Sequence, residues 1–143
     1  MTDQPRIAII GAGPAGLTLA RILAVGGMAA TVFEREAHAS ARGQGGTLDL
    51  HADSGQLALK LAGLHEQFLA LARYEDQGNR LCDKTGRWVV VDDDSEEGDR
   101  PEVDRAALRK LLLDSLSQNT VRWGHALTEI RPTAEGTYEI HFA

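Results

Sequence analysis

The stretch Ile7-Ala8-Ile9-Ile10-Gly11-Ala12-Gly13-Pro14-Ala15-Gly16 decides the fold of this 143-residue chain. Its first four residues are apolar and predict a buried parallel strand. Gly11 permits a tight turn after that strand, Gly13 lets the backbone approach a pyrophosphate, and Gly16 lets the next helix pack close to the strand. Pro14 suits the first turn of that helix, because the N–H that proline lacks would have no partner there.

A second strand and a carboxylate complete the pattern. The helix is predicted over Pro14 to about Val25, with Gly26 and Gly27 able to cap its end. Residues 29–33 then form a strand that ends at Glu34, whose carboxylate can accept hydrogen bonds from ribose hydroxyls. Hydrogen bonds to charged groups are worth about 1.5–3 kcal/mol each. Because all the parts occur in the expected order, we prefer a dinucleotide-binding βαβ unit to a tight turn without a ligand.

Composition narrows the class of protein. The length is that of about one domain, and 43% hydrophobic with 25% charged residues is ordinary for a soluble globular protein. The net charge of −6 argues against a nucleic-acid or membrane-surface binder. The apolar stretches are too short for a transmembrane helix, and the N-terminus does not resemble a secretory signal. A single cysteine, Cys82, excludes an internal disulfide and is compatible with a cytoplasmic protein.

The remainder of the chain departs from a simple repeat of βα units. Residues 36–47 are small, polar and glycine-rich and predict a loop. The elements expected next are a short strand at 47–50, a helix from Ser54 that Gly63 breaks in two, a β-hairpin of 80–83 and 87–91, an acidic loop at 92–100, a helix after Asp104, and strands at 120–123, 127–130 and 137–142. A nicotinamide-type domain would add another αβ unit sooner. We therefore predict an α/β, Rossmann-like FAD/NAD(P)-binding fold with a parallel sheet, helices and an added β-hairpin.

Other side chains with chemical potential are assigned structural roles. The acidic run 93–98 is only loosely similar to a calcium loop, because a strand precedes it and Asp104 stands where an EF-hand has a glutamate. The five histidines form no pair at metal-ligand spacing, so we expect no metal. We expect Cys82 to be a part-buried apolar residue, and Trp88 and Trp123 to lie in the core.

Several stretches together resemble the group A flavin monooxygenases, the aromatic-hydroxylase type that binds FAD. The matching stretches are 9–17, 32–35, Arg42 with the Gly45-Gly46 loop, and 103–109. Within that family, residues 45–51 with 54–56 are most similar to the tetracycline-inactivating monooxygenases. The resemblance extends over essentially the whole chain. The arginine-helix motif combined with the GGTLDL stretch is more specific than the glycine motif, which many families share.

The resemblance implies which residues bind the adenosine half of FAD. The loop that would hold the pyrophosphate comprises Gly11, Gly13, Pro14, Ala15 and Gly16. Glu34 would bind the adenosine ribose. Arg35 would lie along the adenine side, where its planar guanidinium can stack or donate hydrogen bonds. Leu127 would lie beside the adenine through its backbone.

Two further contacts are implied nearer the flavin. Asp49 would lie near the flavin ring, although a short aspartate before a turn often only bonds backbone. Arg105 would reach the pyrophosphate or the ribityl chain, since a cation at a helix start suits two phosphate charges and Asp104 is a plausible N-cap for that helix. The alternative for helical arginines is a solvated, salt-bridged face. We assign Arg109 to a structural role of that kind.

The resemblance implies the FAD-binding portion of a monooxygenase, in which NADPH or NADH is the transient reductant and an organic, aromatic or tetracycline-like substrate is hydroxylated. Such enzymes run to several hundred residues. Residues 1–143 would therefore be the N-terminal part of the FAD-binding domain without the substrate domain, and a small-molecule substrate would bind only if further residues complete the site. We name no catalytic residue and expect little turnover from this chain alone.

Two other functions remain open. A nicotinamide-binding reductase module would use the same glycine loop, and Glu34 would then favour NAD over NADP because its charge repels a 2′-phosphate. A non-catalytic remnant or partner subunit would need a second chain to complete the site. Apolar surface left uncovered in that case would favour self-association.

Overall fold

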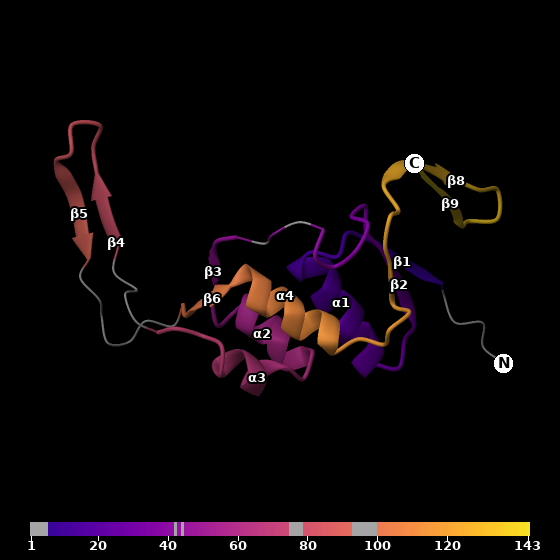
Figure 1. Ribbon diagram of the computed structural model, residues 1–143, viewed down its shortest axis with the longest axis horizontal. Coiled ribbons are helices and arrows are strands. Elements are labelled where there is room, and N and C mark those ends of the chain that lie inside the picture. Colours follow the sequence, from indigo (N-terminus) through magenta and orange to yellow (C-terminus); the bar gives the residue numbers. More distant parts are fainter. Residues whose placement is uncertain (1–5, 42, 44, 75–78, 93–99) are drawn as a thin grey trace.

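A computed structural model describes residues 6–41, 43, 45–74, 79–92 and 100–143 (Figure 1). The elements in chain order are β1 (Ile7–Ile10), α1 (Pro14–Val25), β2 (Ala30–Phe33), β3 (Thr47–Asp49), α2 (Gly55–Leu61), α3 (His65–Leu69), β4 (Asn79–Cys82), β5 (Trp88–Asp92), β6 (Glu102–Asp104), α4 (Arg105–Asp114), β7 (Val121–Arg122), β8 (Leu127–Pro132) and β9 (Tyr138–Phe142). The predicted first helix and the predicted division of the 54–69 segment at Gly63 are confirmed. Gly63 has a φ of 67°, which favours glycine and ends a helix.

The sheet that positions the site is parallel, with strand order β1-β2-β7. Ile10 is paired with Phe33, so β1 and β2 end next to each other at the C-terminal end of the parallel sheet. The N–H of Gly11 donates to the carbonyl of Phe33 at 2.8 Å, which continues the pairing by one residue. The glycine loop and Glu34 therefore emerge side by side, as a βαβ unit requires.

Helices α1 and α4 lie side by side at the centre of the molecule, with α2 and α3 beside them (Figure 1). They bury Leu17 and Leu112 completely, together with Val32 of β2. Burying one such side chain stabilises the fold by about 1.5–3 kcal/mol. Because α4 packs against α1, its N-terminal turns lie near the loop from which α1 begins.

A second, two-stranded sheet holds the start of α4. Strands β3 and β6 are antiparallel, with Thr47 opposite Asp104 and Asp49 opposite Glu102. The N–H of Arg105 donates to the carbonyl of Gly46 at 3.1 Å. The two stretches that carried the more specific part of the family resemblance are thus neighbours in space.

Two antiparallel hairpins complete the described chain, β4–β5 and β8–β9. The predicted hairpin near residue 85 is confirmed, and Figure 1 shows β4–β5 extending away from the helices. Both of its faces are exposed, and Trp88 is 57% exposed. The predictions that Trp88 lies in the core and that Cys82 is part-buried are therefore wrong, since Cys82 is exposed too.

Two local expectations also differ from the structure. The sequence predicts a buried strand at residues 7–10, but Ile10 is 42% exposed, because β1 is an edge strand of the described sheet. Asp104 does occupy the N-cap position of α4, yet its side chain makes no capping hydrogen bond. Its carboxylate instead lies 3.3 Å from the Arg73 guanidinium.

Several sequence features fall outside the described residues, namely Arg42 and the acidic run 93–98. Among the residues that the structure does describe, no group of three or more histidine, cysteine, aspartate or glutamate side chains is arranged to hold a metal ion. Within the same residues, no helix has both the length and the apolar character to cross a membrane.

Candidate dinucleotide site at the glycine loop

A cavity of about 410 Å³ opens where β1 and β2 end. It is lined by Ile10, Gly11, Ala12, Gly13, Phe33, Glu34, Arg35, Glu36, Arg109, His125, Ala126 and Leu127. Five of the residues predicted to contact a cofactor are among them: Gly11, Gly13, Glu34, Arg35 and Leu127. The structure therefore brings these five residues together around one cavity.

The glycine loop has the geometry that its sequence predicted. Gly11 turns with a φ of 100°, a conformation that side chains disfavour. A Cβ on Gly16 would collide with the Gly11 carbonyl oxygen. Because glycine has no Cβ, the helix can start this close to the strand. A Cβ on Gly13 would meet nothing within 4 Å, so this residue keeps the cavity side of the loop open. The loop combines one glycine needed for packing with one that leaves room for a ligand.

The start of α1 supplies hydrogen-bond donors. The first helical hydrogen bond of α1 runs from the Leu17 N–H to the Gly13 carbonyl at 3.0 Å. The N–H groups before Leu17 precede that bond and, with the positive end of the helix dipole, suit an anion. Pro14, Ala15 and Gly16 begin this helix and do not line the cavity, so their part in binding stays a prediction.

Glu34 is a buried residue of the cavity lining and is held by backbone donors. Its Oε2 accepts from the Ala12 N–H at 2.7 Å and its Oε1 accepts from the Glu36 N–H at 3.0 Å. Burial by itself raises the pKa of Glu34, but the N–H groups of Glu36 and Ala12 and the charge of Arg109 together hold that pKa below its ordinary value. An ionised carboxylate has about four acceptor positions, so Glu34 can accept further hydrogen bonds beyond those from its backbone donors.

Arg109 is one of the residues of this site that the sequence analysis missed, together with Phe33, Glu36 and His125. Its side chain belongs to α4 and is only 4% exposed, so the predicted solvated helix face is wrong for it. Nε donates to the Ala12 carbonyl at 3.0 Å, and Nη1 donates to the Ala39 carbonyl at 2.7 Å. The guanidinium also lies 5.5 Å from the centre of the Trp123 ring. Leucines on both sides of Arg109 in the apolar stripe of the helix were the only signal in the sequence that it points inward.

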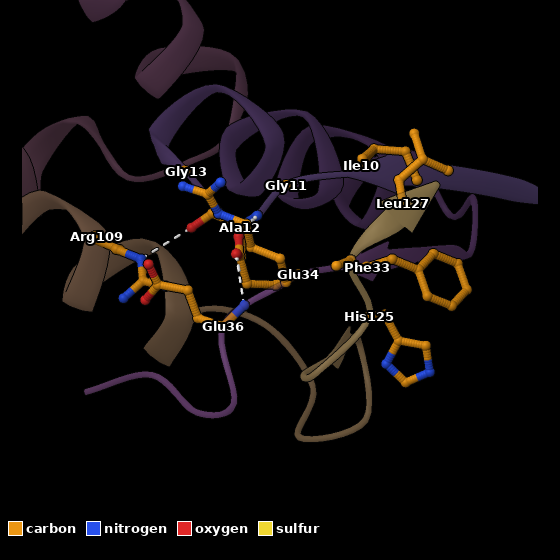
Figure 2. A pocket seen from close by; sticks show the side chains of 12 residues that line it. Ile10, Gly11, Ala12, Gly13, Phe33, Glu34, Glu36, Arg109, His125 and Leu127 are labelled. Atoms are coloured by element: carbon orange, nitrogen blue, oxygen red, sulfur yellow. Dashed lines mark hydrogen bonds between the residues drawn. The ribbon is translucent and has the colours of Figure 1, made fainter. Parts of the chain in front are cut away.

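The opposite end of the cavity is aromatic and apolar. Figure 2 shows Phe33 and His125 at the end opposite Arg109. Their ring centres lie 5.5 Å apart. The backbone N–H of His125 donates to the Glu34 carbonyl at 2.8 Å, which holds the histidine next to the carboxylate residue. Leu127 completes this wall. A flat apolar surface of this kind suits a purine base.

The residues predicted near the flavin lie elsewhere. Asp49 is in β3 and Arg105 is the first residue of α4, and both are exposed and outside the lining of the cavity. Asp49 pairs with Glu102 in the β3–β6 sheet, and Arg105 directly follows β6, so both lie in this part of the fold and outside the cavity. Their contacts to a cofactor stay predictions.

The donor set fits the adenosine diphosphate half of a dinucleotide. The glycine loop offers N–H groups to phosphates, Glu34 offers oxygens to hydroxyls, and the aromatic wall offers a face to a base.

Comparison with known proteins identifies the family. The FAD binding domain family matches residues 4–137. This chain belongs to the FAD binding domain family.

The relatives of this FAD binding domain are monooxygenases. The monooxygenase asqM of Emericella nidulans is 39% identical over 132 residues, which is 89% of this chain and 29% of that protein. The crystal structure of a candidate FAD containing monooxygenase from Photorhabdus luminescens is 27% identical, with a TM-score of 0.76 over 96% of this chain and 35% of that one. The chain thus spans about a third of the length of these relatives.

The fold also extends to tetracycline destructases. Tetracycline destructase Tet(55) has a TM-score of 0.65 at 22% identity, covering 99% of this chain and 37% of that one. At that identity the match confirms the fold. The predicted Rossmann-like FAD-binding fold and the resemblance to FAD-dependent monooxygenases are therefore both confirmed.

Proposed function

We propose that this FAD binding domain is the portion of a flavin-dependent monooxygenase that holds the adenosine half of FAD. The observation that carries the proposal is the juxtaposition of the open glycine loop with the buried, ionised carboxylate of Glu34. The family match supports FAD over the nicotinamide alternative, since the same loop could serve either cofactor.

The chain's own residues would bind and orient the cofactor. The N–H groups at the start of α1 would receive the pyrophosphate, and Glu34 would accept the ribose hydroxyls. The adenine would lie beside Leu127 and Arg35. Asp49 in β3 would lie near the flavin ring, and Arg105 at the start of α4 would contact the ribityl chain or the pyrophosphate.

When bound, FAD supplies the redox and oxygen chemistry, and the protein contributes orientation and electrostatics. We propose NADPH or NADH as the reductant and an organic molecule as the substrate. We assign no catalytic acid or base among the residues described. Because the chain spans 29% of asqM, the substrate pocket and turnover are proposed to require further residues. A cytoplasmic location, which a lone free thiol suits, belongs to the same proposal.

The test is direct ligand binding by the purified chain. FAD, ADP and NAD are titrated separately by calorimetry, and the visible spectrum of the protein as isolated is recorded for bound flavin. We expect FAD and ADP to bind, and Glu34→Ala to weaken both. Arg105→Ala should weaken FAD while leaving ADP less affected, if Arg105 contacts the ribityl side. Glu135→Gln, in the exposed turn of the β8–β9 hairpin, is the matched charge control.

The other outcomes separate the remaining functions. If the chain binds NAD but not FAD, the proposal is contradicted and a reductase module is favoured. Binding of no nucleotide by a folded chain would favour a non-catalytic remnant or a subunit that needs a second chain.

A further inference from the structure

Arg109 connects three segments that are distant in sequence. From α4 it donates to the Ala12 carbonyl of the glycine loop and to the Ala39 carbonyl of residues 35–41, the segment that follows β2. Its guanidinium lies over the ring of Trp123, which follows β7. Figure 2 shows the side chain reaching from its helix toward Ala12. One side chain therefore joins the three chain segments that surround Glu34.

The same loop residue is held from both sides. The Ala12 carbonyl accepts from Arg109, while the Ala12 N–H donates to Glu34 at 2.7 Å. The peptide groups flanking Ala12 are thus fixed between a cation and an anion. The neighbouring residues are held by backbone hydrogen bonds, since the Gly11 N–H donates to the Phe33 carbonyl and the Gly13 carbonyl accepts from Leu17.

We propose that Arg109 is a positioning residue of the nucleotide site, which sets the glycine loop and residues 35–41 around the ribose-binding carboxylate. This inference rests on the proposed function, because it assumes that an adenosine diphosphate group occupies the pocket. Arg109 acts through Ala12 and Glu34, because its Nε and Nη1 donate to the backbone carbonyls of Ala12 and Ala39.

A lysine could not replace it fully. The two carbonyls are reached by different nitrogens of one planar group, whereas an ammonium is a single centre of charge. Lysine would keep the positive charge near Glu34 but not both backbone contacts. Comparing lysine with an uncharged residue therefore separates the charge from the geometry.

The experiment measures ADP affinity by calorimetry for the parent chain, Arg109→Lys, Arg109→Met and the control Lys110→Met. Lys110 is the next residue on α4, and its ammonium pairs with Asp114 at 2.6 Å on the exposed side of the helix. Circular dichroism checks that each variant is folded at the working temperature. ADP is the probe because the described pocket accounts for that half of FAD alone.

We expect Arg109→Met to weaken ADP binding by about tenfold or more, as the loss of charged hydrogen bonds predicts. Arg109→Lys should recover part of that loss, and Lys110→Met should stay within about twofold of the parent. Equal ADP affinity in the parent and a folded Arg109→Met would overturn the inference while leaving the proposed function intact. Absence of ADP binding by the parent would instead contradict the proposed function.

The pH dependence of binding gives a readout that a purely structural role would not change. The charged or titratable groups near Glu34 are Arg109 from α4, Arg35 and Glu36 from the following residues, and His125 from the segment after β7. Without Arg109, Glu34 should become protonated at a higher pH, so ADP affinity should fall at a higher pH than in Lys110→Met. His125 is present in both variants, so it cannot account for a difference between them. If Arg109→Met does not fold, the pH dependence of ADP binding is measured for Arg109→Lys instead. Because lysine keeps the positive charge, this pH dependence should match that of Lys110→Met, and a mismatch would refute the contribution of the charge.

Discussion

The backbone N–H of Ala12 lies 2.7 Å from Oε2 of Glu34. This hydrogen bond joins the loop after β1 to the residue after β2, across the edge where both strands end. The carboxylate proposed to bind ribose and the loop proposed to bind phosphate are therefore parts of one hydrogen-bonded unit. A change in the charge of Glu34 should alter the loop as well as the carboxylate.

Replacing Glu34 with glutamine should weaken ADP and FAD binding and change the response of the fold to acid. Two backbone N–H groups point at the carboxylate, and a glutamine amide would place its NH2 group against one of them. We expect at least about a tenfold loss of ADP affinity at neutral pH. Calorimetry with Glu135→Gln as the control measures it.

The acid response follows from the sign of the pKa change. The pKa of Glu34 is lower in the folded chain than its ordinary value, so its contribution to stability is present above the unfolded pKa. That contribution is lost as the pH falls through the folded pKa. Urea unfolding between neutral and acid pH should therefore show a shallower pH dependence for Glu34→Gln than for the parent. Parallel profiles would contradict this interpretation of the site.

Two of the three glycines of the loop should separate stability from binding. Gly16→Ala should destabilise the fold by about 1–3 kcal/mol or more, because its Cβ would collide with a backbone oxygen that cannot move without displacing Gly11. Gly13→Ala has free space for its methyl group and should remain folded. We expect it nonetheless to weaken ADP binding, because that space is where a phosphate would approach. Urea unfolding and calorimetry on both variants provide the comparison. Tight ADP binding by Gly13→Ala would place the phosphates elsewhere.

The sequence predicted the parts of the site that are local in the chain. The glycine loop, α1, β2 and Glu34 lie within one βαβ unit, whose spacing is fixed by strand and helix geometry. Arg109 lay outside this reach, because its partners Ala12 and Ala39 are brought to it only by the packing of α4 on α1. The periodicity of a helix does not show whether an arginine beside its apolar stripe is buried or solvated.

The same limit explains the tryptophans. Trp88 and Trp123 both occur in strand patterns, yet one is exposed on a hairpin and the other lies beneath Arg109. Strand periodicity predicts which residues share a face but not what that face packs against. The hairpin itself was predicted correctly because its turn is encoded by adjacent residues.

Arg21 should be important for stability but not for nucleotide binding. Its Nε donates to the Ala62 carbonyl and its Nη1 to the Ser115 carbonyl, at 3.1 and 2.9 Å. These residues are the C-caps of α2 and α4, where unpaired carbonyls and the helix dipole favour a cation.

Arg21→Met should therefore lower the free energy of unfolding by about 1–3 kcal/mol. Arg87→Met, in the exposed β4–β5 hairpin, should change it little. ADP affinity, measured where Arg21→Met is still folded, should match that of the parent. A large loss of affinity without a loss of stability would mean that Arg21 communicates with the pocket through α1.

The β4–β5 hairpin should open locally as Asp83 is protonated. The Thr85 hydroxyl donates to Asp83 Oδ1 at 2.6 Å, and the N–H groups of Thr85 and Arg87 donate to the same oxygen at 2.8 and 3.1 Å. These hydrogen bonds hold the pKa of Asp83 below its ordinary value. The turn should thus stay closed through mildly acid pH and loosen only as the pH falls through that lowered pKa. Hydrogen exchange at the Thr85 and Arg87 amides, compared between the parent and Asp83→Asn, measures this. Because the hairpin extends away from the pocket, ADP affinity should be the same in both chains, and a difference would show that the hairpin is coupled to the nucleotide site.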